Sequence, residues 1–207
     1  DSEAYMGPEP FREPESKAIG DYIRKQQNIT MLLSFHTFSQ LILYPWSFKN
    51  QGIENQKDLA VYQRLANQMA EWNHYTPMQS SQLYIASGDT TDWAYGEEKI
   101  FSFTFELDPG EWSVFSGGFY PGSNIIPDVF NKNLRPSLFL AEYSDNPYRI
   151  LDEASASAAP SVNFSNFSNF ASFEQLLNIM NLTSPTRSSL GYDGRSLALR
   201  WWESLEL

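Results

Sequence analysis

Two residues carry the chemistry that this sequence suggests, a histidine and a glutamate that each follow an expected strand. His36 comes directly after the apolar run over residues 29–35, and Glu106 lies near the end of the alternating segment over residues 100–107. A histidine in such a place can bind a metal ion or move a proton, although a lone histidine is more often a core residue with both nitrogens hydrogen bonded. A carboxylate is costly to bury unless it is paired or has a function, so Glu106 is a candidate functional residue.

The strands that hold these residues are predicted from their apolar patterns. Residues 29–35 form a short continuous apolar run, which is typical of a strand buried on both faces of a sheet. In residues 100–107 phenylalanines alternate with polar residues, so the phenylalanines pack under helices and Glu106 lies on the polar face. Ligands bind beyond the carboxyl ends of strands in open α/β sheets, and two neighbouring strand ends can bring His36 and Glu106 to one point.

Helices are expected around these strands. The apolar spacing and the positions of proline predict helices over residues 17–27, 54–73 and 127–143. Pro136 removes one backbone donor from the last of them, which predicts a kink or a break. His74 falls at the C-terminal end of the second helix, where it is interpreted as structural because a cation suits the helix dipole. Residues 37–48 are expected to form a loop, since Pro45 and Ser47 interrupt them.

Composition narrows the class of protein. The 207 residues are 42% hydrophobic, and 25 acidic against 14 basic side chains give a net charge of −11, which disfavours nucleic-acid and anionic-membrane partners. No apolar run is long enough to span a membrane. The chain has no cysteine, which excludes disulfides and thiolate chemistry and leaves the compartment unassigned from redox chemistry. Its first residues lack an initiator Met and a signal peptide, which indicates a cleaved product or a fragment.

The composition changes after Leu151. Residues 1–151 are interpreted as one unit, and residues 152–207 as an extension with a low-complexity linker and two possible short helices over 173–181 and 196–205. Glycosylation sequons, which matter only in a host that glycosylates, begin at Asn28, Asn163, Asn166 and Asn181.

Three segments, taken in this order and spacing, resemble the zinc carboxypeptidases of the funnelin type, the family of carboxypeptidases A, B and T. They are SFHTFSQLILYPW, LYIASGDTTDWAY and FSFTFELDPG, and the opening DSEAYMGPEPFREPES also looks like that family. The resemblance covers residues 1 to about 151. It implies an α/β fold with a mixed, mostly parallel twisted sheet flanked by helices, of which this chain supplies the C-terminal half. It also implies a secreted or periplasmic enzyme that releases C-terminal amino acids from peptides.

The resemblance implies a role for each matching residue. His36 matches a zinc ligand, and Glu106 matches the general base that takes a proton from the zinc-bound water. Tyr84 matches a tyrosine on a mobile loop that closes over the substrate. The remaining matches concern substrate binding and are Thr37, Asp89 and Thr91.

The last two of these residues match the pocket for the C-terminal side chain. The aspartate at position 89 makes this pocket similar to that of carboxypeptidase T, which suggests mixed specificity for apolar and basic C-terminal residues. The family's cis peptide bonds would fall at Thr37-Phe38, Pro45-Trp46 and Asp108-Pro109.

The sequence departs from the family in its ligand set. A catalytic zinc site uses three protein ligands and a water molecule, and the family takes two of the three from a His-x-x-Glu motif. Neither that motif nor the Asn-Arg pair that clamps the substrate carboxylate occurs here. We therefore expect one zinc ion that needs two further ligands from outside this chain, with the N-terminal half of the same catalytic domain as partner.

Two alternatives to an active two-piece enzyme stay open. The chain could be a truncated or inactive carboxypeptidase-like fragment that serves as a binding or structural module. A carbohydrate-active protein would also use paired carboxylates in an aromatic setting, for which Glu106, Asp89 and Asp92 are candidates.

Overall fold

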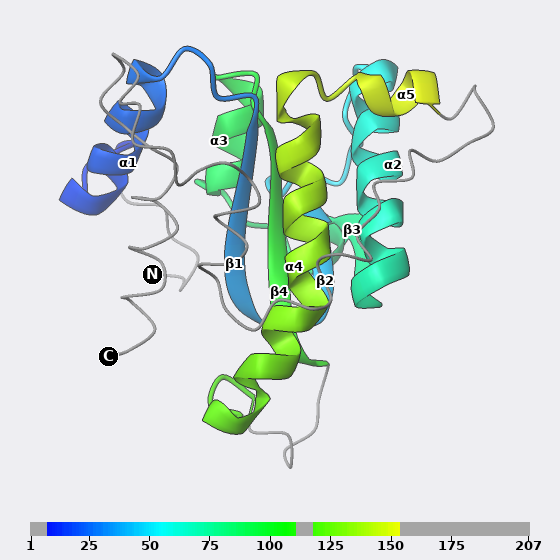
Figure 1. Ribbon diagram of the computed structural model, residues 1–207. Helices are drawn as coiled ribbons and strands as arrows, with labels where there is room; N and C mark the ends of the chain where they lie inside the picture. Colours follow the sequence, from blue (N-terminus) through cyan, green and yellow to red (C-terminus); the bar gives the residue numbers. More distant parts are fainter. Residues whose placement is uncertain (1–7, 111–117, 154–207) are drawn as a thin grey trace, which may run out of the picture. The chain divides into compact units, whose positions relative to one another are not determined.

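The fold is a mixed sheet flanked by helices, seen in a computed structural model that describes residues 8–110 and 118–153 (Figure 1). The sheet has four strands in the order β1-β4-β2-β3. They are β1 (Met31–Ser39), β2 (Leu41–Tyr44), β3 (Thr76–Gln79) and β4 (Phe101–Gly110). β1 pairs with β4 and β2 with β3 in parallel, whereas β2 and β4 are antiparallel, which confirms the predicted mixed, mostly parallel sheet.

Helices connect and cover these strands. The α-helices are α1 (Pro14–Lys25), α2 (Gln56–Asn73), α3 (Thr90–Gly96), α4 (Ile126–Glu142) and α5 (Arg149–Glu153). Short 3₁₀ helices are η1 (Ser80–Gln82), η2 (Ser123–Ile125) and η3 (Tyr143–Asp145). The three predicted helices are confirmed as α1, α2 and α4, with ends that differ by a few residues. Within the described ranges, no helix has the length and apolar content needed to cross a membrane.

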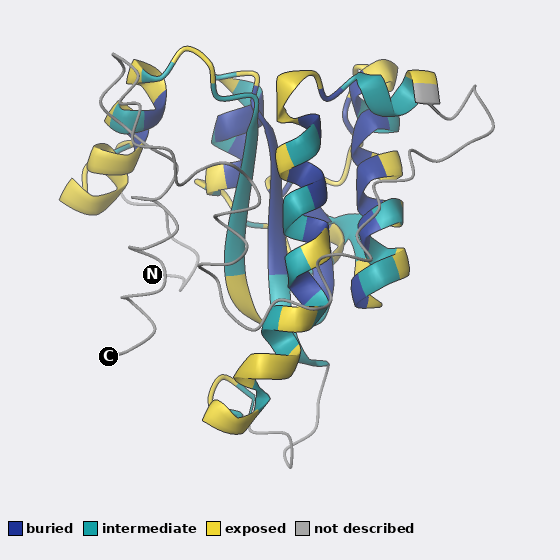
Figure 2. Ribbon diagram, in the orientation of Figure 1, coloured by how far each residue is buried: buried dark blue, intermediate teal, exposed yellow. Residues whose placement is uncertain are grey.

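The core lies between the sheet and helices α2 and α4, whose buried residues are dark blue in the ribbon of Figure 2. Phe103 and Phe105 of β4 are fully buried, and the ring of Tyr62 from α2 lies 5.1 Å from that of Phe103. Leu65 of α2 and Phe139 of α4 belong to the same cluster. The alternation of phenylalanines along β4 therefore predicts the core face correctly.

The ends of α2 show why the helix occupies these residues. Asn55 accepts hydrogen bonds from the amides of Lys57 and Asp58 at 3.0 and 3.3 Å, and so caps the first turn. His74 closes the helix in a left-handed conformation with φ of 60°, donating its amide to Ala70. The predicted place of His74 at the helix C-terminus is confirmed.

The prediction for β1 is wrong in two respects. The strand does not end before His36 but continues to Ser39, so the histidine lies inside it. Its residues are half-buried or exposed instead of fully buried. The reason is that β1 is the edge strand of the described sheet and pairs with β4 alone.

The segments around β2 and β3 also differ from the prediction. Residues 37–48 are not a loop, because they contain the end of β1 and all of β2, whose Leu41 to Leu43 are buried between β3 and β4. The pairing partners of β2 come from residues far along the chain, so its four apolar residues carried no clear strand signal. β3 and α3 were not predicted at all.

Pro136 lies inside one continuous helix, α4, so the predicted break is absent. The missing proline amide removes one backbone hydrogen bond but does not end the helix, which packs against α2. All three cis peptide bonds implied by the resemblance are confirmed, at Thr37-Phe38, Pro45-Trp46 and Asp108-Pro109. The extension over residues 152–207, with its two possible helices and three of the sequons, lies almost wholly outside the described residues and stays a prediction.

Candidate active site

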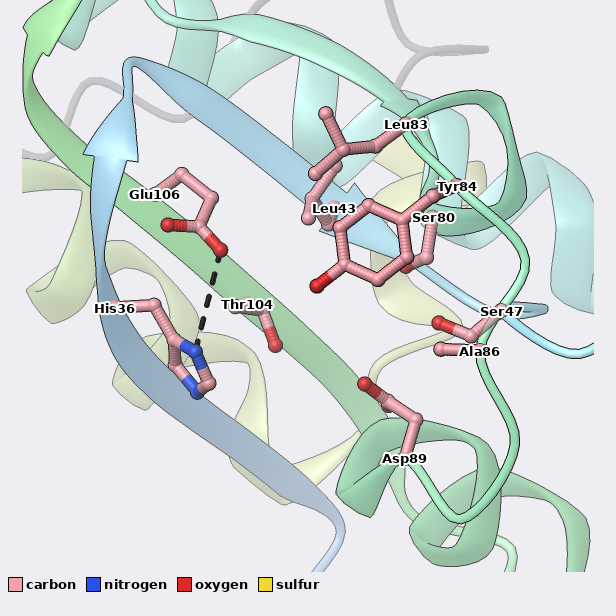
Figure 3. Close-up of a pocket in the computed structure, with 10 residues that line it drawn as sticks. All are labelled: His36, Leu43, Ser47, Ser80, Leu83, Tyr84, Ala86, Asp89, Thr104 and Glu106. Atoms are coloured by element: carbon pink, nitrogen blue, oxygen red, sulfur yellow. Dashed lines mark ion pairs between the residues drawn. The ribbon is translucent and has the colours of Figure 1, made fainter. Parts of the chain in front are cut away.

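A cavity brings together four of the six site residues that the sequence suggests (Figure 3). His36 comes from β1, Glu106 from β4, Tyr84 from the segment after η1, and Asp89 from the residue before α3. The rest of the lining consists of Leu43, Ser47, Ser80, Leu83, Ala86 and Thr104. Strand pairing and the residues between η1 and α3 thus place side chains from distant parts of the sequence around one space.

The centre of the cavity is the pair formed by His36 and Glu106. The two residues are direct partners in the parallel β1–β4 ladder, and His36 Nδ1 lies 4.0 Å from Glu106 Oε1. The other imidazole nitrogen, Nε2, lies 3.1 Å from the hydroxyl of Ser34. The histidine side chain is 56% exposed, whereas the glutamate side chain is only 13% exposed.

Burial sets the protonation behaviour of Glu106. Loss of water around the carboxylate raises its pKa above the ordinary value, and the charge of a protonated His36 acts in the opposite direction but does not cancel the effect. A carboxylate with a raised pKa is a stronger base than an exposed one, and a pKa closer to neutral suits proton exchange near neutral pH. The environment of Glu106 therefore favours the protonated carboxyl more than water does.

Tyr84 is the most exposed large side chain of the lining and lies on the segment that joins η1 to α3. The residue is 61% exposed, and its hydroxyl points into the cavity from the side opposite His36 (Figure 3). The segment is anchored by the Ala86 amide, which donates to the Ser47 carbonyl at 3.2 Å. An exposed tyrosine on such a connection can reach over a ligand that enters the cavity.

Asp89 has a structural role as well as a place in the cavity. Its Oδ1 accepts hydrogen bonds from the amides of Thr91 and Asp92 at 2.7 and 3.2 Å, so it caps α3. The Thr91 hydroxyl donates to the same oxygen, and Thr91 is 1% exposed and does not line the cavity. Thr37 is exposed on β1 and is not part of the lining either.

Several lining residues were missed by reasoning from the sequence. Thr104 could have been found, because it lies two residues before Glu106 and so shares its face of β4. Ser47 had no such signal, because its place depends on Asp92, whose carboxylate accepts the Ser47 amide at 2.9 Å and the Phe48 amide at 3.0 Å. Burial raises the pKa of Asp92 to about 6, against the lowering effect of these two amides.

The described residues do not form a complete metal site. No group of three or more His, Cys, Asp or Glu side chains within them could hold a metal ion. A catalytic zinc site needs three protein ligands, so His36 could be only one of them.

The fold and the cavity together define a class of protein, an α/β domain in which a histidine and a partly buried carboxylate face one cavity. A family model described as "Zinc carboxypeptidase" matches residues 1–135. The chain belongs to the zinc carboxypeptidase family.

Known relatives agree with this assignment. Carboxypeptidase A5 of Macaca fascicularis is 36% identical over 152 residues, which are 71% of this chain and 34% of the relative. Carboxypeptidase A1 of Homo sapiens is 33% identical over 153 residues, or 71% of this chain and 35% of that protein. The chain thus spans about a third of the length of the curated relatives it matches.

A solved structure gives the same result for the fold. The crystal structure of thrombin activatable fibrinolysis inhibitor superposes with a TM-score of 0.60 and 27% sequence identity. The match covers 68% of this chain and 36% of that one.

The capping role of Asp89 gives a first prediction. Asp89→Ala removes the acceptor for two amides of α3 and should lower the free energy of unfolding by about 1 kcal/mol. Asp89→Asn keeps a capping oxygen and should change it by only a few tenths of a kcal/mol. Urea unfolding of both variants measures the difference, and equal losses for both would contradict the capping role.

Proposed function

We propose that this chain is the C-terminal half of a zinc metallocarboxypeptidase catalytic domain and releases C-terminal amino acids from peptides together with an N-terminal segment. The observation that carries the proposal is the His36–Glu106 pair, held at 4.0 Å by the β1–β4 register and facing the same cavity as Tyr84 and Asp89. Membership of the zinc carboxypeptidase family supports the reaction class. A secreted or periplasmic location is part of the same proposal.

In the proposed reaction Glu106 handles the proton. It accepts a proton from the water that attacks the scissile carbonyl and passes it to the nitrogen of the leaving amino acid. Its raised pKa makes Glu106 a stronger base for the first transfer, and a pKa closer to neutral still allows the second. The nearby imidazole keeps this pKa from rising further.

His36 supplies one metal ligand in this proposal. A zinc ion, when bound by a full ligand set, polarises the carbonyl and lowers the pKa of its water to about 7. The two missing ligands and the clamp for the substrate carboxylate would come from the N-terminal segment. The exposed imidazole is accessible for such a shared site, since more than half of its side chain contacts solvent.

The open edge of β1 supports a complementary segment on physical grounds. Within residues 8–110 and 118–153, the structure describes no strand on the side of β1 that faces away from β4. Exposed edges are usually protected by charged residues or proline, and β1, MLLSFHTFS, has neither. Its apolar residues Met31, Leu33 and Phe35 are only partly buried, so a partner on this edge would remove further apolar surface from water.

Tyr84 and Asp89 are proposed to bind substrate. The Tyr84 hydroxyl would hydrogen bond the terminal peptide group or carboxylate. Asp89 would face the C-terminal side chain and favour basic residues, since no Lys or Arg lines the cavity and two carboxylates do. The leucines of the lining leave room for apolar side chains as well. Thr37 and Thr91 lie outside the lining. Their predicted part in substrate binding would therefore be indirect, through neighbouring residues.

The alternatives are less well supported. Asp92 does not line the cavity, and its oxygens are occupied by the Ser47 and Phe48 amides, so the carbohydrate-active reading loses one of its carboxylates. A catalytically inactive binding or structural module remains the competing function, and activity measurements separate it from the proposal.

The role of Glu106 is tested by substitution with the isosteric amide. In the enzyme assembled from this chain and its N-terminal segment, Glu106→Gln should lower kcat by about 10²- to 10⁴-fold, because the amide cannot accept the proton. Peptidase assays on a free C-terminus measure the loss, with Glu71→Gln on the exposed face of α2 as the matched control. Turnover within about tenfold of the wild type would exclude Glu106 as the general base.

The shared metal site is tested by metal analysis. The 207-residue chain alone should bind zinc weakly and below one ion per chain, because a single histidine makes a poor site. With the N-terminal segment present, one tightly bound ion per complex is expected, and His36→Ala should reduce it. Tight stoichiometric zinc in the chain alone would show that the ligand set has been misjudged.

The specificity is tested with Asp89→Asn, which keeps the helix cap and removes the charge. Hydrolysis of substrates that end in Lys or Arg should slow by roughly 5- to 50-fold, a loss typical of one partly solvated charge pair, while substrates that end in Leu or Phe should be unaffected. The ratio of kcat/KM values for a matched Lys and Leu substrate pair measures the effect. An unchanged ratio would remove Asp89 from the specificity pocket.

A further inference from the structure

A second cluster of polar residues lies at the end of β4, outside the lining of the cavity. Asp108 accepts hydrogen bonds from the side-chain amide of Gln40, the hydroxyl of Tyr75 and the ammonium of Lys132. These donors come from three places: the turn between β1 and β2, the residue before β3, and α4. One carboxylate therefore connects four segments of the fold.

The cluster extends into a buried layer that has hydrogen-bond partners throughout. The Tyr75 hydroxyl accepts from the Asn133 amide at 2.9 Å, and Asn133 in turn accepts from the Asn73 amide at 3.1 Å. Asn73 also accepts the backbone amide of Tyr75 at 3.0 Å. All three residues are buried, and a buried network with its polar groups satisfied is rigid.

Asp108 carries charge into this network. Burial alone would raise its pKa, but the hydrogen bonds from Lys132, Tyr75 and Gln40 outweigh burial and lower it. The carboxylate is therefore ionised at neutral pH, and hydrogen bonds to an ionised acceptor are about twice as strong as neutral ones.

The position of the cluster relates it to the proposed active site. Asp108 lies two residues after Glu106, and Gln40 lies four residues after His36. Between Thr37 and Ser39 the regular β1–β4 register shifts, so the ladder alone no longer fixes the two strands beyond that point.

Gln40 reconnects the strands after this shift. Its amide donates to the Leu107 carbonyl at 3.3 Å, and its side chain reaches Asp108. A Cβ atom on Gly110 would come within 2.7 Å of the Gln40 side-chain oxygen, so glycine allows this close approach.

We propose that Asp108 is a positioning residue that fixes the ends of β1 and β4 to each other and thereby keeps His36 and Glu106 at their working separation. It does not line the cavity, and it acts through Gln40, Tyr75 and Lys132. The catalytic part of this inference rests on the proposed function. Its structural part, that the Asp108 hydrogen bonds hold the strand segments around Thr37 and Glu106, does not.

Asp58, at the N-terminal end of α2, offers a matched control for Asp108. Asp58, in the first turn of that helix, is buried and accepts hydrogen bonds from Tyr95 at 2.7 Å and Tyr148 at 2.6 Å. Asp108 is linked to the C-terminal end of α2 through hydrogen bonds of Tyr75 and Asn73. Both sites thus combine a carboxylate of low solvent exposure with tyrosine hydroxyls, but only Asp108, which is half-buried, adjoins the strand ends after His36 and Glu106.

The experiment compares Asp108→Asn and Tyr75→Phe with Asp58→Asn and Tyr148→Phe. In the assembled enzyme, the first two variants should lower kcat by roughly tenfold or more with KM within about twofold, because small displacements of reacting groups are costly. The two control variants should keep kcat near the wild-type value even where their melting temperatures fall as far as those of Asp108→Asn and Tyr75→Phe. Equal kcat losses in both pairs at equal loss of stability would overturn the positioning role.

A second measurement does not depend on activity. In NMR spectra of the 207-residue chain, Tyr75→Phe should shift the backbone amide signals of Thr37 and Glu106, whereas Tyr148→Phe should leave them in place. Tyr75→Phe removes only a hydroxyl, so this readout survives if Asp108→Asn fails to fold. If the wild-type assembly proves inactive, the proposed function fails while the amide shifts still decide the structural part. Unchanged signals in Tyr75→Phe would overturn it.

Discussion

The arrangement of the candidate site depends on the parallel pairing of β1 with β4. That register puts His36 directly opposite Glu106, and because side chains alternate along a strand, a slip of one residue would turn one of them to the other face. The same alternation directs Phe103 and Phe105 into the core. The register that buries these phenylalanines therefore also places His36 opposite Glu106. Core packing therefore protects the geometry of the His36–Glu106 pair, since any slip would expose buried aromatic rings.

Carboxylates that are buried or half-buried connect other segments of the fold. The chain has no disulfide, and connections between distant segments are made instead by Asp58, Asp92 and Asp108, each of which accepts more than one hydrogen bond. Asp92 holds the segment that carries Ser47 into the cavity, and Asp108 holds the ends of β1 and β4. Such groups are costly to bury unless every acceptor is used, which makes them sensitive to the exact placement of their donors. The net charge of −11 thus includes carboxylates that organise the fold as well as surface charges.

The sequence predicts best where a pattern is local. The alternation in β4 and the apolar spacing of α2 identify both elements, and the family resemblance assigns His36, Tyr84, Glu106 and Asp89 to what proves to be one cavity. Prediction from the sequence fails where an element depends on partners that are distant along the chain. β3, with the residues TPMQ, has a proline and no alternation and forms only because β2 lies beside it. The extension of β1 beyond His36 likewise follows from pairing with β4, and the partial burial of β1 follows from its edge position, which no local pattern reports.

The proposed division of the catalytic domain has a consequence for stability as well as for chemistry. His36 lies on the strand whose outer edge has no partner in the described part of the chain, so a segment that pairs there would bring its metal ligands close to the imidazole. Pairing would cover the partly buried residues Met31, Leu33 and Phe35, and metal binding would add its free energy to that association because the ligands are shared. Assembly and metal binding are then linked, each increasing the apparent affinity of the other. The incomplete ligand set and the unprotected edge of β1 then have one common explanation, since a single complementary segment would supply the missing ligands and pair with the edge.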